Sequence, residues 1–512
     1  MTEELKEEDF SFVQLDETIH DTKFETKPIG YLKDAWLRFK KNKASLVALI
    51  IIIIIIVLFG LFYPLTTSKK LSDVDTEYSF MRPKNLFLSK LGICDGTYTK
   101  KGTVSAYAQS YGIGLGYEYR SENTTQAFNI NQPLQFSAVK KIKKRYMEDG
   151  LEYLDFKVDQ YVDKGFEYTQ ITQSEWNDII KWQEETGYQI LFPLIDTEGY
   201  NSIQKTNANL WYKMNTKGYP LDKNGKVVTN IDDLEYLIPN FLYNQEGEVL
   251  YRTPAGSNSY NVRVFRYTRY MYQHGSKEPS FLLGSDGMGY DIAIRLAYGI
   301  RLSLILAITV SLINLVIGTI YGAIEGFYGG TVDIVMERIA DILSNIPTMV
   351  VISLFNIFLV ETNKTSPIVA FIIAFIVTGW LGTAYRVRTQ FYRFKNQEYV
   401  LAAKTLGAKD RRLMFKHILP NALGTIITSS ILVIPGVIFS ETSLSYLGII
   451  DLNGPNASSI GTMLSNGSQY LSTYPHIILW PTIIIALLML SFNLFGNGLR
   501  DAFNPSLRGT EE

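Results

Sequence analysis

The residues whose types and spacing suggest chemistry lie in one stretch, EYVLAAKTLGAKDRRLMFKHILP, from Glu398 to Pro420. Ala402 and Ala403 favour a helix, and Gly407 ends it because glycine enters left-handed backbone at little cost. Small side chains on an exposed helix let a partner's backbone approach closely, and the surrounding basic residues would pair with acidic groups. We therefore expect two short helices, the second over 411–418, that dock a partner. The alternative is a solvated loop whose basic residues only set membrane topology.

Residues that could catalyse a reaction or hold a cofactor form no such pattern. The four histidines lack metal-ligand spacing, no Gly-x-x-x-x-Gly-Lys-Ser/Thr loop cradles nucleotide phosphates, and no Gly-x-Ser-x-Gly elbow is present. The single cysteine, Cys94, excludes an intrachain disulfide, and the formal net charge of −1 gives no field that would attract nucleic acid. We predict that the chain is not an enzyme and holds no metal or cofactor.

The elements that must position the docking stretch are long apolar segments. Six of them are long enough to cross a hydrocarbon layer of about 30 Å; they cover 45–63, 302–323, 339–360, 368–385, 423–439 and 476–495. Basic residues crowd the start of the first segment, which places the N-terminus in the cytoplasm. Counting forward, the docking stretch is cytoplasmic, and the loop 441–475, which has no Lys or Arg, lies outside.

The long polar block between the first two spans, residues 64–280, falls outside the membrane and is large enough to fold by itself. A helix is expected over 172–187, begun by a capping box of Thr172 and Glu175 and ended by Gly187. Strands are expected over 154–158 and 262–270, and Asn224-Gly225 predicts a hairpin turn. We therefore expect an α+β extracellular domain.

These expectations define an all-α polytopic membrane protein with six transmembrane helices and a large inserted α+β domain between the first and second. The predicted divisions are a cytoplasmic tail and basic segment over 1–44, the first span over 45–63, the inserted domain over 64–280, a membrane core over 281–500 that includes the docking stretch 398–420, and a cytoplasmic tail over 501–512.

The docking stretch resembles the ATPase-docking loop of ABC importer permeases, in which Glu-Ala-Ala is followed by three residues, Gly, nine residues, Ile, one residue and Leu-Pro. Here Leu401 stands where Glu is usual and His417 where Ile is usual, but the alanines, the glycine and the Leu-Pro keep the spacing. Three further segments, at 281–304, 329–350 and 492–508, resemble oligopeptide and dipeptide permeases, and the N-terminal segment 32–53 resembles their C-type subunit. The resemblance covers about 28–66 and 281–508, and not most of the outer block.

The resemblance implies a type I ABC importer permease in a bacterial plasma membrane, with both ends cytoplasmic. Its implied partners are a second, B-type permease, two ATP-binding subunits that hold ATP and Mg²⁺, an extracellular peptide-binding lipoprotein, the peptide and membrane lipid. The docking residues it implies are Glu398, Leu401, Ala402, Ala403, Gly407, Ala408, Arg411, Arg412, Leu419 and Pro420.

Polar residues within apolar segments suggest a pathway for the transported solute, and Asn345 and Asn356 are the candidates. Two alternatives stay open. One is a permease of the same family for nickel or another small solute. The other is a membrane-anchored sensor or adhesin that acts through its outer domain and leaves the docking stretch idle.

Overall fold

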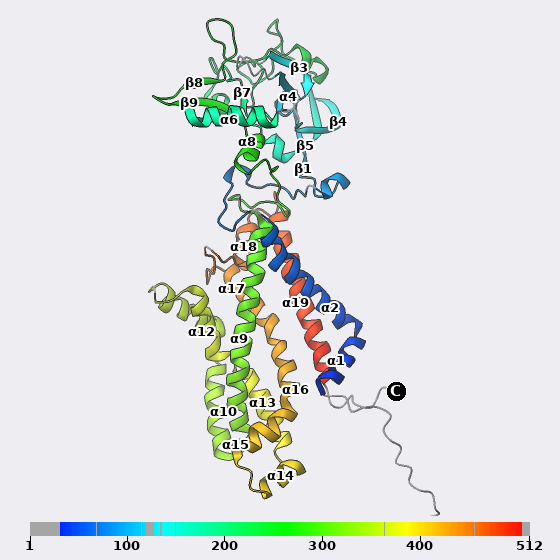
Figure 1. The fold of residues 1–512 in the computed structure, drawn as a ribbon, viewed down its shortest axis with the longest axis vertical. Coiled ribbons are helices and arrows are strands. Elements are labelled where there is room, and N and C mark those ends of the chain that lie inside the picture. The colour runs from blue at the N-terminus through cyan, green and yellow to red at the C-terminus, as the bar shows by residue number, and fades with distance from the viewer. Residues whose placement is uncertain are drawn as a thin grey trace, which may run out of the picture.

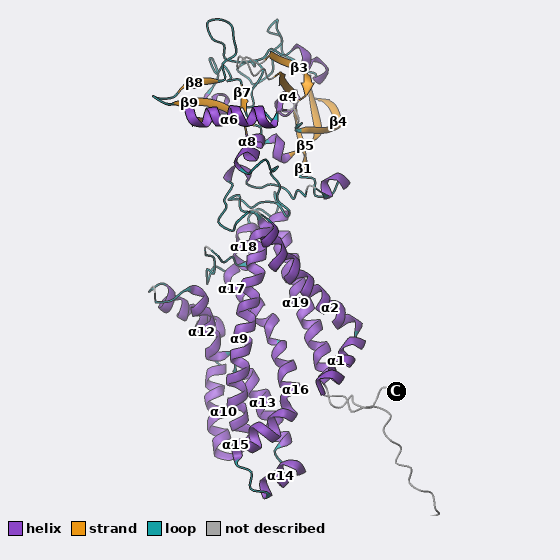
Figure 2. Cartoon of the chain, in the orientation of Figure 1, coloured by secondary structure: helices purple, strands orange, loops and turns teal. Residues whose placement is uncertain are grey.

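The computed structural model describes residues 31–67, 69–85, 87–113, 115–118, 127–133, 136–148, 150–362, 364–454 and 456–503. Figure 1 shows a head that contains the strands, a narrow neck and a bundle of long helices. Strands and long helices are fully segregated between the two ends (Figure 2). Most of the predicted tails, 1–44 and 501–512, lie outside the described residues.

Within the described residues, five helical stretches are long and apolar enough to cross a membrane: Lys43–Thr66, Ile292–Tyr328, Pro367–Phe394, Asp410–Tyr446 and His476–Phe503. The first stretch consists of α2 (Lys43–Ile54), η2 (Ile55–Phe62) and α3 (Tyr63–Thr66), the second is α9 (Ile292–Tyr328), and the third consists of α12 (Pro367–Thr378) and α13 (Leu381–Phe394). The fourth consists of α15 (Asp410–Arg412), η7 (Leu413–Ile418), α16 (Leu419–Ile431) and α17 (Val433–Tyr446), and the fifth is α19 (His476–Phe503). The short helices α1 (Tyr31–Lys41) and α18 (Ile460–Ser468) flank them.

The predicted span 339–360 is not one straight helix. α10 (Gly330–Ser344) and the pair α11 (Thr348–Phe355) and η6 (Asn356–Val360) meet at a 72° bend. Pro347 stands at the break, where its missing N–H and its ring prevent the helix from continuing. The bent pair is either a broken sixth span or a re-entrant loop, so the expectation of six spans is supported only to this extent.

The predicted second short helix of the docking stretch does not stop at Pro420. Asp410–Tyr446 continues as one helical stretch of 37 residues. A turn of π-helix, Leu413–Ile418, precedes the proline, and the Leu419 N–H donates to the Met414 carbonyl five residues back. The wider turn accommodates a residue without an N–H, so the helix passes the proline without breaking.

Small residues bring the central helices together. α9 packs along α13, and Gly318, Gly322 and Gly326 repeat every four residues on the contact face. A Cβ added at Gly322 would lie 2.2 Å from the Ala384 carbonyl oxygen. Close backbone approach at such a small-residue stripe is the usual way for helices to pack in lipid, where the hydrophobic effect gives no attraction between them.

The head contains two main sheets. β1 (Thr97–Thr103), β5 (Leu151–Asp159) and β4 (Val139–Glu148) form one in that order, and the other places β9 (Ser259–Phe265) between β6 (Phe166–Thr172) and both β7 (Leu191–Phe192) and β8 (Arg252–Pro254). A separate pair joins β2 (Leu115–Glu118) to β3 (Ala127–Pro133). The head helices are α4 (Val104–Ile113), α5 (Gln160–Asp163), α6 (Gln173–Thr186), α7 (Ser202–Thr206) and α8 (Arg266–Gln273).

Local signals in the head are confirmed where a cap or turn residue fixes them. Thr172 accepts a hydrogen bond from the Glu175 N–H at 3.2 Å and begins α6, so the described contacts contain the Thr172 half of the predicted capping box and not the half from Glu175. The helix ends at Gly187 with φ +74°. Residues 154–158 lie within β5. The turn at Asn224-Gly225 forms, since the Asp222 N–H donates to the Lys226 carbonyl at 2.9 Å, but only isolated bridges flank it.

The predicted strand 262–270 is wrong in its second half. β9 ends at Phe265, and Arg266–Gln273 is the helix α8. The alternation of aromatic and polar residues fits both structures over so few positions. The helix buries Tyr267, Tyr270 and Met271, which are spaced three and four residues apart on one face.

Candidate functional site

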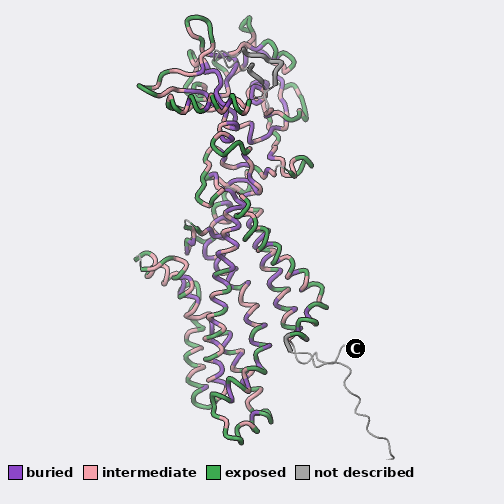
Figure 3. The backbone as a smooth tube through the Cα atoms, in the orientation of Figure 1, coloured by how far each residue is buried: buried purple, intermediate pink, exposed green. Residues whose placement is uncertain are grey.

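α14 (Glu398–Thr405) lies at the end of the bundle opposite the head (Figure 1). Val400 is its buried residue, and Ala403 packs on the same apolar cluster, which includes Val387, Phe391 and Ile418. The opposite face is open, because Leu401 is 49% and Leu406 is 88% exposed. Figure 3 shows this end of the molecule as mostly exposed. The helix is thus fixed to the bundle by one narrow face and presents apolar side chains outward.

Gly407 turns the chain immediately after α14. Its φ is +81°, a conformation that L-residues rarely adopt, and a Cβ at this position would meet nothing within 4 Å. The glycine is therefore required by backbone conformation within the chain, while the space beside it is free. The left-handed backbone of the turn requires a glycine at 407 whether or not a partner binds. The open surface beside it would in addition let a partner approach closely.

The other predicted docking residues surround this turn. Ala408 and Leu419 pack against the cluster under α14, while the remaining ones, Glu398, Ala402, Arg411, Arg412 and Pro420, are exposed. The structure therefore gathers the predicted set at one end of the bundle, and divides it into side chains that hold the loop and side chains that are available.

A charged cluster that was not predicted from the sequence joins three helices of the bundle. The Arg388 guanidinium of α13 contacts Asp333 at 2.7 Å and Glu337 at 2.7 Å, both on α10, and Glu325 of α9 at 3.5 Å. Charge-assisted, multidentate bonds of this kind fix orientation as well as adding energy. One arginine therefore links three helices. The signal was the pair of acids four residues apart on one helix face.

The two predicted pathway residues do not lie together. Asn345 caps α10, and its side-chain amide donates to the Asp341 carbonyl at 2.7 Å within the same turn. The Asn356 amide donates to the Ile449 carbonyl at 3.2 Å and joins η6 to the loop after α17. Both have local structural partners, and a role in the solute pathway stays a prediction.

A buried carboxylate lies among the ends of the helices on the side of the head. Glu441 of α17 is 0% exposed and accepts hydrogen bonds from the hydroxyls of Ser303 on α9 and of Ser459, both at 2.8 Å. The hydroxyls of Thr442 and Ser445 lie within 3.5 Å. A buried charged or polar group is tolerated only when it is hydrogen-bonded. The repeated serines of SETSLSYL were the available signal.

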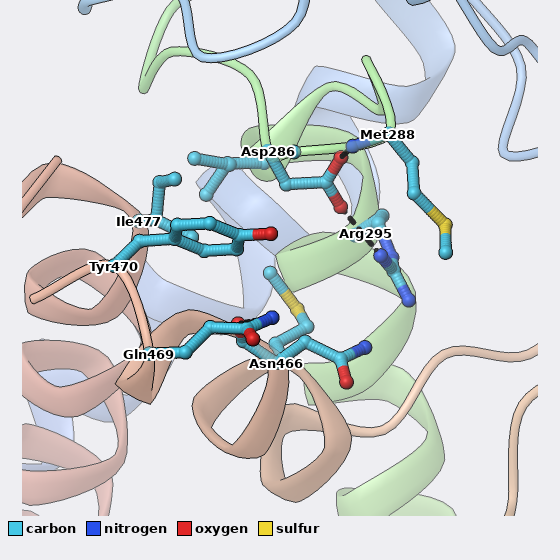
Figure 4. A pocket seen from close by; sticks show the side chains of 10 residues that line it. Asp286, Met288, Arg295, Asn466, Gln469, Tyr470 and Ile477 are labelled. Carbon is cyan, nitrogen blue, oxygen red and sulfur yellow. Dashed lines mark hydrogen bonds and ion pairs between the residues drawn. The ribbon is translucent and has the colours of Figure 1, made fainter.

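A small hollow opens beside this end of α9 (Figure 4). It has a volume of about 140 Å³, and Asp286 and Arg295 form an ion pair at 2.6 Å on one wall. The amides of Asn466 and Gln469 and the ring of Tyr470 form the other side. Because the two charges are paired with each other, the hollow is polar without carrying net charge.

The neck consists of the segment from Lys69 to Lys84 and the segment from Phe281 to Asp291, which are joined by backbone hydrogen bonds and an ion pair. The Lys84 N–H donates to the Phe281 carbonyl at 2.8 Å, and the Ser285 N–H donates to the Met81 carbonyl at 3.0 Å. The Lys69 ammonium contacts Asp291 at 3.2 Å, and burial lowers the pKa of that ammonium. Asp291 also accepts the Ala293 N–H at 2.9 Å and so caps α9.

The geometry defines a class of protein: a helical membrane protein of several spans with an exposed helix-turn at one end of its bundle. The family described as binding-protein-dependent transport system inner membrane component matches residues 318–509. The N-terminal transmembrane domain of oligopeptide transport permease C matches residues 30–83. Neither match includes the sheets of the head.

Curated relatives agree with these matches. The chain is 43% identical to the oligopeptide transport system permease protein OppC of Bacillus subtilis (strain 168), over 47% of this chain and 79% of that protein. It is 38% identical to the dipeptide transport system permease protein DppC of Lactococcus lactis subsp. cremoris (strain MG1363), over 46% of this chain and 67% of that protein. An inward-facing structure of the MetNI methionine ABC transporter aligns with a TM-score of 0.34 and 17% identity, over 41% of this chain and 96% of that one.

The chain belongs to the family of binding-protein-dependent transport inner membrane components. It is therefore a transport permease rather than an enzyme.

Proposed function

We propose that this permease is the C-type membrane-spanning subunit of an ATP-driven importer of oligopeptides or dipeptides. In this proposal a second permease and two ATP-binding subunits complete the transporter, and a binding lipoprotein delivers the peptide. Both ends of the chain are cytoplasmic in a bacterial plasma membrane, and the head is extracellular. The peptide class follows the names of the relatives, which are oligopeptide and dipeptide permeases.

One observation carries the proposal: α14 and the turn at Gly407 expose small and apolar side chains at the end of the bundle farthest from the head. Leu406, at 88% exposure, has no reason within the chain to be apolar. A cleft in an ATP-binding subunit would cover it. The distribution of charge supports the orientation, since basic residues follow α13 and surround α14, while the loop 447–475 near the head has none.

The contacts of α14 connect it mechanically to helices of the bundle. Val400 and Ala403 press on the cluster that contains Val387 and Phe391 of α13 and Ala323 of α9. Because packed interiors shift as units rather than deforming smoothly, a displacement of α14 moves these helices together. ATP-driven closure of the partner subunits would thus reach the bundle as a rigid-body movement, as alternating access requires.

The direct test is site-specific crosslinking in native membrane vesicles. Leu406→Cys in a Cys94→Ser background places the chain's one thiol on the docking surface, and Ile203→Cys, 80% exposed in the head, is the matched control. We expect Leu406→Cys to crosslink to an ATP-binding subunit, with a yield that changes when ATP is trapped. A Leu406→Cys yield no higher than the Ile203→Cys yield would overturn the docking.

The substrate class needs its own measurement. Vesicles that contain the complete transporter and its lipoprotein are loaded with ATP, and uptake of a radiolabelled peptide and of radiolabelled nickel is measured in parallel. We expect uptake of the peptide and not of nickel. Uptake of nickel alone would retain the docking and reject the peptide assignment, and no uptake of either solute would favour the sensor or adhesin.

A further inference from the structure

The loop between Asn85 and Cys94, at the base of the head, exposes three large apolar side chains. Phe87 is 75%, Leu91 is 68% and Ile93 is 57% exposed. We name these three residues the apolar spur. They lie on and around η4 (Leu88–Leu91), the short blue helix that projects from the neck in Figure 1. Exposed apolar side chains scattered singly are common, but a group of three on one loop tip marks an interaction surface.

The base of this loop is held firmly, so the exposure belongs to a defined conformation. The Asn85 N–H donates to the Cys94 carbonyl at 2.9 Å and closes the loop. The Asn85 side-chain oxygen accepts the N–H groups of Phe87 and Leu88 at 2.9 and 3.0 Å, and Gly92 ends η4 with φ +76°. The adjacent Lys84 forms a buried ion pair with Asp159 of β5 at 3.1 Å. The fold therefore presents the spur on a fixed support.

The spur lies next to the outer end of the first span. Phe87 and Asn85 line the same hollow, of about 750 Å³, as Tyr63 and Thr66 at the end of that span. In Figure 1 the spur projects to the side on which α1 and α2 descend. Figure 3 shows both the spur and the outward side of α2 as largely exposed.

The first span also exposes apolar side chains at the end that lies beside the spur. Phe62 is 59% and Leu65 is 79% exposed at its outer end, while α2 packs on α19 on its other side. In a membrane-spanning helix, apolar residues that face away from the bundle meet lipid. The spur continues this lipid-facing surface beyond the last turn of the helix, and Lys90, exposed within η4, adds a positive charge at the level of the headgroups.

We propose that the apolar spur rests in the interfacial layer of the bilayer beside the first span. Phe87, Leu91 and Ile93 enter the boundary between headgroups and acyl chains, and Lys90 lies among the lipid phosphates. Aromatic and aliphatic residues with an adjacent cation are the side chains that anchor proteins at this depth. The spur thus gives the head a second attachment to the membrane, besides the neck. The proposal depends on the spans crossing a bilayer and not on which solute is transported.

Lipid contact can be measured in the unmodified chain. The complete protein in nanodiscs of phosphatidylcholine and phosphatidylglycerol is irradiated with a diazirine probe that partitions into the acyl region, and labelled peptides are mapped by mass spectrometry. We expect labelling of 87–93 to equal that of 61–65 and to exceed several-fold that of the peptide that contains Ile203. Labelling of 87–93 at the level of Ile203 would overturn the proposal.

Fluorescence distinguishes lipid from a protein partner. In the Cys94→Ser background, Leu91→Cys, Leu65→Cys and Ile203→Cys carry an environment-sensitive fluorophore, and lipids brominated near the headgroup are the quencher. We expect the labels at 91 and 65 to be quenched to the same extent and the label at 203 to stay unquenched. A label at 91 that is shielded from water but not quenched would assign the spur to a protein contact, and would contradict lipid anchoring.

Discussion

The neck and the α14 loop both connect long helices of this permease, but their construction is opposite. The neck is closed: Lys84 and Asp159 are paired with both side chains less than 10% exposed, and Phe80 stacks on Tyr474 with ring centroids 4.5 Å apart. The α14 loop is open, and its most exposed apolar side chain, Leu406, is 88% exposed. The side chains of the neck find their partners within the chain, which makes the neck a rigid connection. The apolar side chains of the α14 loop are left exposed, and we expect another chain to cover them.

Glycines with positive φ turn the chain at both ends of the helical stretch Asp410–Tyr446. Gly407 beside α14 and Gly448 after α17 have φ values of +81° and +70°, and a Cβ at either would meet nothing within 4 Å. The two turns lie at opposite ends of Asp410–Tyr446. They are alike in backbone conformation and in the free space around the Cβ position, so we expect a partner to be the source of any difference between them in transport.

The largest effect is expected from Gly407→Glu. Both Gly407→Glu and Gly448→Glu place an L-residue in left-handed backbone, at a cost of about 1 kcal/mol. Only Gly407→Glu adds a bulky charge to the docking surface, and we expect peptide uptake to fall by at least about tenfold, which corresponds to about 1.4 kcal/mol of lost coupling. Uptake by vesicles is the measurement, with membrane insertion checked by immunoblot. Equal uptake by the two variants would contradict the docking of a partner at Gly407.

Removing the head tests whether the closed joint serves delivery. The neck contacts set the bounds of the deletion: a deletion that begins after Asn85 keeps the backbone hydrogen bonds between Met81 and Ser285 and between Lys84 and Phe281. We replace residues 86–279 with a short Gly-Ser linker. We expect assembly and basal ATP hydrolysis to be retained and lipoprotein-dependent uptake to fall severalfold, measured at saturating lipoprotein and peptide. Full uptake would show that the head has no part in delivery.

Breaking the Lys69–Asp291 ion pair of the neck should lower the stability of the head. Lys69→Met leaves the Asp291 carboxylate, 5% exposed, without its ammonium partner, and loss of one member of a buried pair costs about 3 kcal/mol. We expect a lower temperature of head unfolding and faster proteolysis between 67 and 80. The double variant Lys69→Met/Asp291→Asn should recover part of the loss, because Asn also caps helices. A single variant as stable as the wild type would reject this account of the neck.

The smallest effect is expected at Asp75, which lies in the neck near Lys69. Burial raises the pKa of the Asp75 carboxyl above its ordinary value, with His274 and Lys69 opposing. A folded pKa above the unfolded one means that the contribution to stability is present at low pH and is lost as pH rises through the folded pKa. Asp75→Asn should therefore slightly raise the unfolding temperature at pH 7 and leave it unchanged at pH 3. A lower unfolding temperature at pH 7 would contradict the assignment.

Local signals were sufficient where one residue determines the backbone. Thr172, Gly187 and Gly407 each fix a helix end, and the sequence places all three correctly. The apolar segments likewise predict the helices, because composition and length decide whether a segment can cross a membrane. The docking set was gathered by its resemblance to a known motif, and its spatial grouping agrees.

Features that depend on distant pairing could not be predicted. Whether Arg266–Gln273 continues β9 or turns into α8 is decided by burial of Tyr267 and Tyr270 in the head. The Lys69–Asp291 pair joins residues separated by 222 positions. Glu441 looks from sequence like a loop residue, since its burial depends on serines of other segments.

The neck also orders the events of synthesis. Its two segments flank the whole head in the chain, so Met81 and Lys84 are made long before Ser285 and Phe281, and Asp291 emerges only when α9 begins. Domains fold as the ribosome releases them, from the N-terminal side. The head is therefore complete in the chain while the first span alone connects it to the bundle, and its base closes only after the segment before α9 is made. A translation stall or truncation before Asp291 would leave a folded but unlatched head, a species that quality-control proteases could recognise.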